Sequence, residues 1–331
     1  MFSGSASQGT KVNPKNPRAI YFNDEVYIGV VPGGLLEMIG VDAKIGGVLY
    51  TFQGVGTGRA PTTTGGAECA RCHSRPQSGY AQGFFVRSVI PNDSGMMVGA
   101  ELLGFEGHER PLGRRFGGWF VTSAHPDIFG RSGLVAETDA ANSRRIMGYR
   151  SIQPGQLYDP KMHLGETSDI LVHLLHEHQI GFHNHVARVL MSAEDDGLEN
   201  GQRVMPTHQR DVDDLVEYML FRREAALPEN GIVGNPQFIA DFSRNRHAAK
   251  SGAALKDLEL TTRLLKHRCS YMIYTRPWAE MPPKVKSEVY AKLHAALFGN
   301  DVSGRHLPRE EKRQIIQILR DTLPDLPADW K

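Results

Sequence analysis

The chain of 331 residues has only three cysteines, little net charge and no long apolar run. The formal net charge is +1 and no segment is densely basic, so we do not expect nucleic acid as a partner. No apolar run approaches the roughly 20 residues of a transmembrane helix, so we expect no transmembrane segment. Hydrophobic residues make up 40% of the chain, which is typical of a soluble globular protein with a sizeable core.

Two of the cysteines lie together in Cys69-x-x-Cys72-His73, the most informative motif of the chain. This spacing is the attachment motif of a c-type haem, in which two thiols add to the porphyrin vinyl groups and the histidine binds the iron. A four-cysteine zinc site would need a second cysteine pair, but the remaining cysteine, Cys269, stands alone. A thioredoxin-like pair would follow a strand, whereas this motif follows a loop rich in glycine and threonine. We therefore expect one covalent haem c, with Cys69 and Cys72 as anchors and His73 as the proximal iron ligand.

The first residues, Met1 to Asn16, are small and polar and lack the apolar centre of a secretory signal. Haem is attached to c-type proteins outside the cytoplasm. From the haem motif alone we therefore expect a periplasmic or extracellular protein, from which a leader or an anchor has been removed in this numbering.

The pattern of apolar residues changes near residue 166 and predicts an α+β protein. We expect a mobile polar tail at 1–19, a β-rich and loop-rich region with the haem motif at 20–165, and a helical region closing over the haem at 166–331, or else one continuous domain. Because the motif lies in a loop, a standard small cytochrome c fold is not expected over the whole chain. Strands are predicted at 21–31, 35–39, 48–52, 83–90 and 117–122, and helices at 168–191, 211–226, 236–245, 255–273, 283–298 and 308–323.

Five of the 14 histidines lie between residues 173 and 185, within the first predicted helix. At about 100° per residue, His178 and His185 share the apolar face, so they should point to the core. The others, His173, His176 and His183, should point away, unless a break at Gly181 turns His183 inward. One histidine could be the sixth iron ligand, or an acid or base above an open iron, or bind another metal; alternatively all are ordinary surface or core residues.

Other residues are weaker candidates for the haem site. His125 follows a predicted strand and could reach the iron, and Arg87 lies near the motif and could pair with a haem propionate. Met96 and Met97 could supply a thioether ligand, although core packing is the simpler interpretation. We expect Cys269 to be a small buried residue; the alternative is a lone thiol that acts as a ligand or forms an intermolecular link.

Several segments together resemble a group of uncharacterised bacterial cytochrome c domain-containing proteins that have a single haem motif. The resemblance covers residues 20–299, and it implies a secreted haem c protein without naming a reaction. It also favours His178 and His183 as the distal residues, and it departs from this chain at Ser74, where the group tends to have glycine. The resembling segments are 21–29, 69–73, 85–89, 115–122, 177–179, 183–184, 260–264 and 269–274.

Three functions follow from a haem motif in a chain roughly three times longer than a small electron carrier needs. The first is a haem c oxidoreductase, with His178 or His183 over the iron and with peroxide or oxygen chemistry if the sixth position is open. The second is a six-coordinate electron-transfer subunit that docks to a redox partner. The third is a haem-based sensor or a structural protein. The partner would be a redox protein or a small-molecule substrate.

Overall fold

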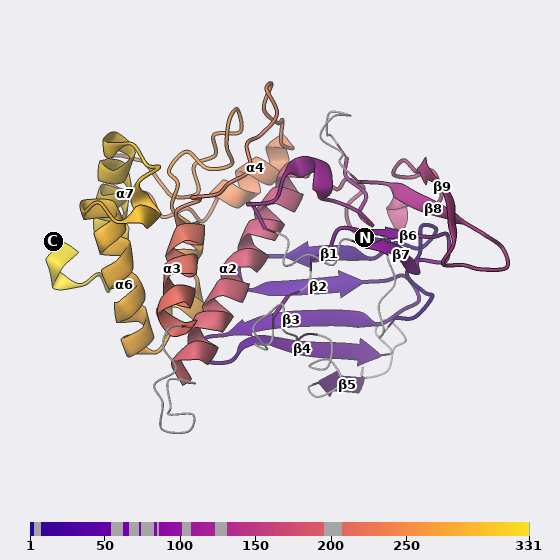
Figure 1. Cartoon of the computed structure of the whole chain (residues 1–331), viewed down its shortest axis with the longest axis horizontal. Helices are drawn as coiled ribbons and strands as arrows, with labels where there is room; N and C mark the ends of the chain where they lie inside the picture. The colour runs from indigo at the N-terminus through magenta and orange to yellow at the C-terminus, as the bar shows by residue number, and fades with distance from the viewer. Residues whose placement is uncertain are drawn as a thin grey trace.

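The computed structural model describes residues 1–2, 8–53, 62–65, 73, 83–84, 86–100, 107–122, 131–194 and 207–330. Strands occupy the first half of the chain and helices the second, so the predicted α+β class is confirmed. The main sheet and the helices lie side by side along the long axis of the molecule (Figure 1). In the described part of the chain, no helix is long and apolar enough to cross a membrane.

The main sheet is an antiparallel meander in which each strand pairs with the next one along the chain. The segment predicted as one strand at 21–31 forms two strands, because the side chain of Asn23 accepts hydrogen bonds from the backbone of Glu25 and Val26, each at 2.8 Å, and closes a turn. The strands predicted at 35–39 and 48–52 are confirmed. The sheet contains β1 (Ala19–Phe22), β2 (Val26–Val30), β3 (Leu36–Asp42), β4 (Gly46–Gln53) and β5 (Thr62–Gly65).

Two small hairpins lie at the end of the molecule away from the C-terminal helices (Figure 1). They are formed by β6 (Val89–Pro91) with β7 (Met97–Ala100), and by β8 (Leu134–Thr138) with β9 (Ile146–Ser151). The strand predicted at 83–90 is mostly wrong, because only its last two residues belong to β6. The strand predicted at 117–122 is also wrong. Phe116 and Gly118 have φ angles of 66° and 78°, and this left-handed turn is incompatible with an extended strand.

The second half contains the helices, and most of the predicted ones are present. The exception is the helix predicted at 255–273, which is wrong: Leu260 has a φ of 62°, and the Glu259 carboxylate accepts hydrogen bonds from the backbone of Thr262 (2.7 Å) and Arg263 (2.8 Å) to form a tight turn. The helices are α2 (Ile170–Glu194), α3 (Thr207–Met219), α4 (Pro236–Ser243), α5 (Arg276–Ala279), α6 (Pro283–Phe298) and α7 (Arg309–Thr322), with short 3-10 turns at Leu112–Arg114, Pro160–Met162, Tyr271–Tyr274, Val302–Gly304 and Ala328–Trp330.

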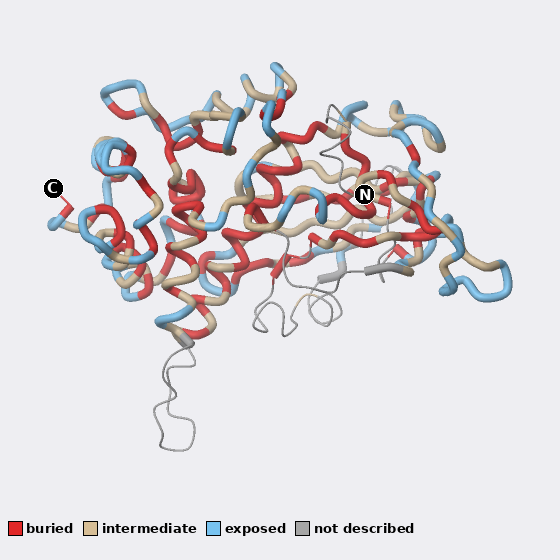
Figure 2. The backbone as a smooth tube through the Cα atoms, turned by 45° about the horizontal axis from the view of Figure 1, so that its top comes forward, coloured by how far each residue is buried: buried red, intermediate tan, exposed pale blue. Residues whose placement is uncertain are grey.

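Helix α2 is the central element, because the sheet covers one side of it and α3 covers the other (Figure 1). Its first turn is capped by Asp169, whose carboxylate accepts a hydrogen bond from the backbone of Leu171 at 2.8 Å. The helix does not break at Gly181, where a Cβ atom would lie 2.0 Å from the Tyr218 hydroxyl of α3. Glycine is needed there because the two helices approach so closely. Figure 2 shows the resulting burial along most of α2.

One hydrophobic core joins the two halves of the chain, since Tyr27 and Phe84 from the first half pack in the same cluster as Leu174 and Trp278. This supports a single continuous domain over two separate ones. The described part of the first 19 residues is not a mobile tail, because Phe2 and Val12 are completely buried; that expectation was wrong.

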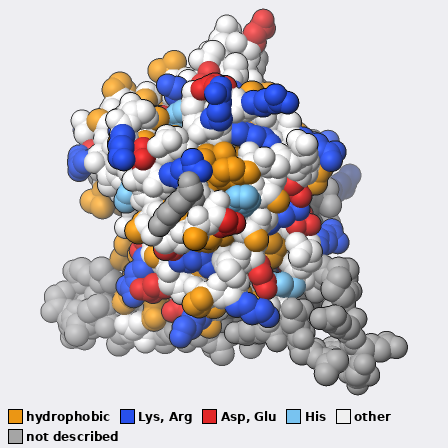
Figure 3. Space-filling view, turned by 90° about the vertical axis from the view of Figure 1, so that its left-hand side faces the viewer, with side chains coloured by type: hydrophobic (Ala, Val, Ile, Leu, Met, Phe, Trp, Pro, Cys, Tyr) orange, Lys and Arg blue, Asp and Glu red, His pale blue; other side chains and the backbone are white. Residues whose placement is uncertain are grey.

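The end of the molecule formed by the C-terminal helices carries Lys, Arg, Asp and Glu side chains side by side (Figure 3). Several of these charges are paired, for example Lys286 with Asp325 at 2.8 Å. The mixture agrees with the small net charge of the chain.

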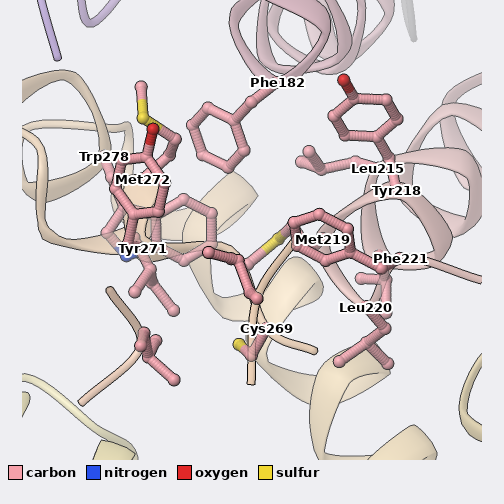
Figure 4. Packing of buried hydrophobic residues seen from close by; sticks show 14 of the residues in the cluster. Phe182, Leu215, Tyr218, Met219, Leu220, Phe221, Cys269, Tyr271, Met272 and Trp278 are labelled. Carbon is pink, nitrogen blue, oxygen red and sulfur yellow. The ribbon is translucent and has the colours of Figure 1, made fainter. Parts of the chain in front are cut away.

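Cys269 lies inside the helical part of the core, among Met219, Leu220, Tyr271 and Met272 (Figure 4). Its side chain is fully buried, and burial raises the pKa of its thiol to about 12. The prediction of a small buried cysteine is therefore confirmed.

Candidate functional site

His73, the histidine of the haem motif, lies half-buried beside the segment at 83–84. Its Nδ1 lies 2.9 Å from the backbone oxygen of Gly83. Because a carbonyl oxygen can only accept, Nδ1 must carry the hydrogen, and Nε2 is then the nitrogen with a lone pair. This is the tautomer and the orientation that a histidine needs to bind a metal through Nε2.

The backbone that accepts this hydrogen bond is fixed by helix α2. The Asn184 side chain accepts a hydrogen bond from the Phe84 backbone nitrogen at 2.8 Å and donates one to the Phe84 oxygen at 3.1 Å. Both groups are buried, where such a pair is strongly favoured. Asn184 thereby sets the position of Gly83, and through it the ring of His73.

Charged groups on the neighbouring strands act on His73. Burial lowers its pKa, the hydrogen bond that it donates to the Gly83 oxygen and the charge of Glu37 raise it, and the positive charges of Arg87 and Arg18 lower it again. Arg18 forms an ion pair with Glu37 at 2.8 Å. Arg87 thus acts on the pKa of His73, and its predicted pairing with a haem propionate stays a prediction.

Three of the predicted site residues, Cys69, Cys72 and His125, lie outside the described residues. Their roles as thioether anchors and as a distal candidate stay predictions. Met96 and Met97 are described, and the side chain of Met97 is exposed on β7.

His183 is the predicted distal residue that lies on the same side of α2 as His73. Its ring stacks on Phe84 with centroids 5.7 Å apart, and its Nε2 donates to the backbone oxygen of Asp24 at 3.0 Å. Its Nδ1 is buried and has no hydrogen-bond partner within the part of the chain that the structure describes. The helix phase placed His183 away from the core, but it is buried because the sheet covers that face too.

His178, the other predicted distal residue, lies on the opposite side of α2, among the helices. Its Nδ1 lies 3.0 Å from Nδ1 of His108, and its Nε2 lies 2.8 Å from the Ser270 hydroxyl. It is fully buried and stacks on Phe221. Both ring nitrogens of His178 are therefore bonded within the protein, and its predicted role as a distal residue over the haem stays a prediction.

Glu177 and Gln179, the neighbours of His178 in the chain, connect α2 to other parts of the structure. Glu177 forms a buried ion pair with Arg115 at 3.0 Å. Gln179 accepts a hydrogen bond from the Tyr27 hydroxyl at 3.0 Å and donates to Asp24 at 2.9 Å. Asp24 in turn pairs with Lys256 at 2.9 Å. Sequence reasoning missed this network, since its members lie up to 232 positions apart in the chain and no local spacing relates them.

Helix α2 also borders a cavity of about 330 Å³. Its residues His173 and His176 line the cavity, together with β1 and the segment at 158–168. Burial lowers the pKa of His173 to about 4 and that of His176 to about 3. Both are therefore neutral at pH 7. The ring of His176 lies 5.7 Å from that of Tyr27, which lies 4.8 Å from Phe84, so a chain of rings runs from the cavity to the neighbourhood of His73.

Among the described residues, no group of three or more His, Cys, Asp or Glu side chains is arranged to hold a metal ion. Comparison of the chain with protein-family models, curated proteins and solved structures gave no match. The resemblance to cytochrome c domain-containing proteins stays a prediction that depends on the residues named above.

Proposed function

We propose that this protein is a haem c oxidoreductase that acts outside the cytoplasm, with haem attached through Cys69 and Cys72. The observation that supports the proposal is the bond from His73 Nδ1 to the Gly83 oxygen, which directs the other ring nitrogen to act as a ligand. When bound, such a haem supplies one-electron redox chemistry. The residues that would hold it are the two cysteines, His73 and Arg87.

The second part of the proposal concerns the sixth position of the iron. His178 is committed to His108 and Ser270, and Nε2 of His183 is committed to Asp24. We propose that His178 does not occupy this position, which favours an open site and an oxidoreductase over a six-coordinate electron carrier. His183, whose Nδ1 has no hydrogen-bond partner among the described residues, is then the candidate on α2 for an acid or base above the open iron.

Covalent haem is tested by denaturing electrophoresis with haem staining after expression with a cytochrome c maturation system. The wild type and Cys269→Ala should stain, because Cys269 lies in the core and not in the motif. The double variant Cys69→Ala, Cys72→Ala should not stain. No signal in the wild type, or a signal that survives the double substitution, contradicts the proposal.

The sixth position is tested by optical spectra of the ferric and ferrous protein with and without cyanide and carbon monoxide. We expect the spectra to change on addition of these ligands, and to be the same in His178→Phe as in the wild type. A low-spin spectrum that does not respond to ligands would favour the electron-transfer function. A change of spin state in His178→Phe would contradict the assignment made for that residue.

The role of Asn184 as a positioning residue is tested by the reduction potential. Asn184→Leu removes both hydrogen bonds to Phe84, loosens the Gly83 carbonyl and weakens its bond to His73. A less strongly bonded imidazole donates less charge to iron, so the reduction potential should rise while haem staining persists. Asn142→Leu, in an exposed turn, is the matched control and should leave the potential unchanged.

A further inference from the structure

The cavity beside α2 has the size and the walls of a binding pocket. Its volume of about 330 Å³ falls at the lower end of small-molecule sites, which span about 300–1,000 Å³. Aromatic rings form much of its wall, from Phe22 of β1, Trp119, Phe120 and Tyr158. Aromatic rings on a wall that also carries polar side chains favour a ligand that combines one or two aromatic rings with a polar group.

Two histidines that line this cavity have a ring nitrogen without a protein partner among the described residues: His163, which is half-buried, and His176, which is almost fully buried. His176 is 4% exposed and lines the cavity, and within the described residues its ring nitrogens make no hydrogen bond. Its neighbour His173 differs, because its Nε2 donates to the Phe120 oxygen at 3.2 Å and contacts the Ser168 hydroxyl at 2.8 Å. A buried imidazole with no partner is costly unless a ligand or water completes its hydrogen bonds.

The interior of the cavity carries little charge of either sign. Both lining imidazoles of α2 are neutral at pH 7, because burial lowers their pKa values to about 4 and about 3. The guanidinium of Arg18 is paired with Glu37 at 2.8 Å, and Glu166 is exposed. A charged ligand would lose its hydration without gaining an opposite charge, so the cavity favours an uncharged one.

We propose that this cavity binds a small, uncharged aromatic alcohol whose hydroxyl group hydrogen-bonds to the ring of His176. A neutral imidazole offers one N–H donor and one acceptor nitrogen, and a hydroxyl group can satisfy either. Rings on the ligand would pack against Phe22 and Trp119. The proposal does not depend on haem attachment, since none of these residues belongs to the haem motif.

The test is calorimetric titration of the full chain with a matched set of naphthalene compounds. Naphthol should bind, whereas naphthoate and naphthylmethylammonium, which carry a charge, should bind at least about tenfold more weakly. His176→Phe keeps an aromatic ring but loses the hydrogen bond, so it should weaken naphthol binding about tenfold and leave naphthalene binding unchanged.

Two further variants serve as a control for His176→Phe and as an independent test of the cavity. His185→Phe changes a half-buried histidine of the same helix that does not line the cavity, and it should bind naphthol like the wild type. Thr167→Trp places a large ring at an exposed residue of the cavity wall and should abolish binding of all four compounds, even if His176→Phe does not fold. Naphthol binding that survives Thr167→Trp, or that is no tighter than binding of naphthalene or naphthoate, would overturn the proposal.

Discussion

The buried histidines of α2 predict that the fold loses stability in mild acid. Burial lowers the pKa values of His173 and His183 to about 4, and those of His176 and His178 to about 3. In the unfolded chain each has a pKa of about 6.5. As the pH falls below about 6.5 the unfolded chain therefore binds protons that the folded protein does not, and the free energy of unfolding decreases.

The size of this effect follows from the same pKa values. At pH 5 each of the four histidines lowers the free energy of unfolding by about 2 kcal/mol relative to pH 7. Glu224 acts in the opposite direction, because burial raises its pKa to about 7 and its protonation in acid recovers at most about 2 kcal/mol. The net loss from these five groups, about 6 kcal/mol, is comparable to the whole stability of many proteins, about 5–15 kcal/mol.

The assay is urea unfolding at pH 7 and pH 5, followed by far-ultraviolet circular dichroism. His176→Phe removes one of the four groups, so its loss of stability between the two pH values should be smaller by about 2 kcal/mol. His247→Gln, which changes an exposed histidine, is the control and should behave like the wild type. Equal stability of the wild type at pH 7 and pH 5, within about 1 kcal/mol, would refute the reasoning.

Three other predictions concern the core and the haem motif. Gly181→Ala should destabilise the protein by about 2 kcal/mol in thermal or urea unfolding, because the new methyl group would meet the Tyr218 hydroxyl; unchanged stability would contradict the close packing of α2 and α3. Arg115→Met should cost about 3–5 kcal/mol, because it removes the charge that balances the buried carboxylate of Glu177, and the added change Glu177→Met should restore much of it. Thiol titration in denaturant should find one reactive thiol per chain, that of Cys269, if the other two cysteines of the three are thioethers; three thiols would refute attachment.

The elements that sequence patterns predict well are those whose signal is local. The helix at 283–298 has the predicted bounds of α6, because it begins at a proline and ends before Gly299. The wrong predictions fall where the backbone conformation does not follow from the pattern of apolar residues. Residues 255–273 have apolar residues at helical spacing, but the positive φ of Leu260 and the Glu259 turn fold them into an irregular segment.

Only the covalent part of the candidate site has a signal in the sequence, and that part stays a prediction because Cys69 and Cys72 lie outside the described residues. The spacing of Cys69, Cys72 and His73 indicates the cofactor, because that chemistry needs neighbouring positions in the chain. The partners of His73 do not follow from spacing, since Gly83 lies 10 positions away and Asn184 reaches Phe84 across 100 positions. The helix phase was misleading for His176 and His183 because it assumed that one face of α2 meets solvent.

Because α2 is buried on both faces, its residues in the resembling segments 177–179 and 183–184 are interpreted differently. On the sheet side, Gln179 and Asn184 hold the β1–β2 turn and the segment that supports His73. On the helical side, Glu177 and His178 bind Arg115 and Ser270. Each of these side chains makes a hydrogen bond to another element, so removing one would cost stability whatever the reaction. We infer that the common role of these side chains is to fix α2 between the sheet and the other helices. We infer further that the proposed redox and binding functions depend on other groups: His73, the cavity at His176, and Nδ1 of His183, which has no partner among the described residues.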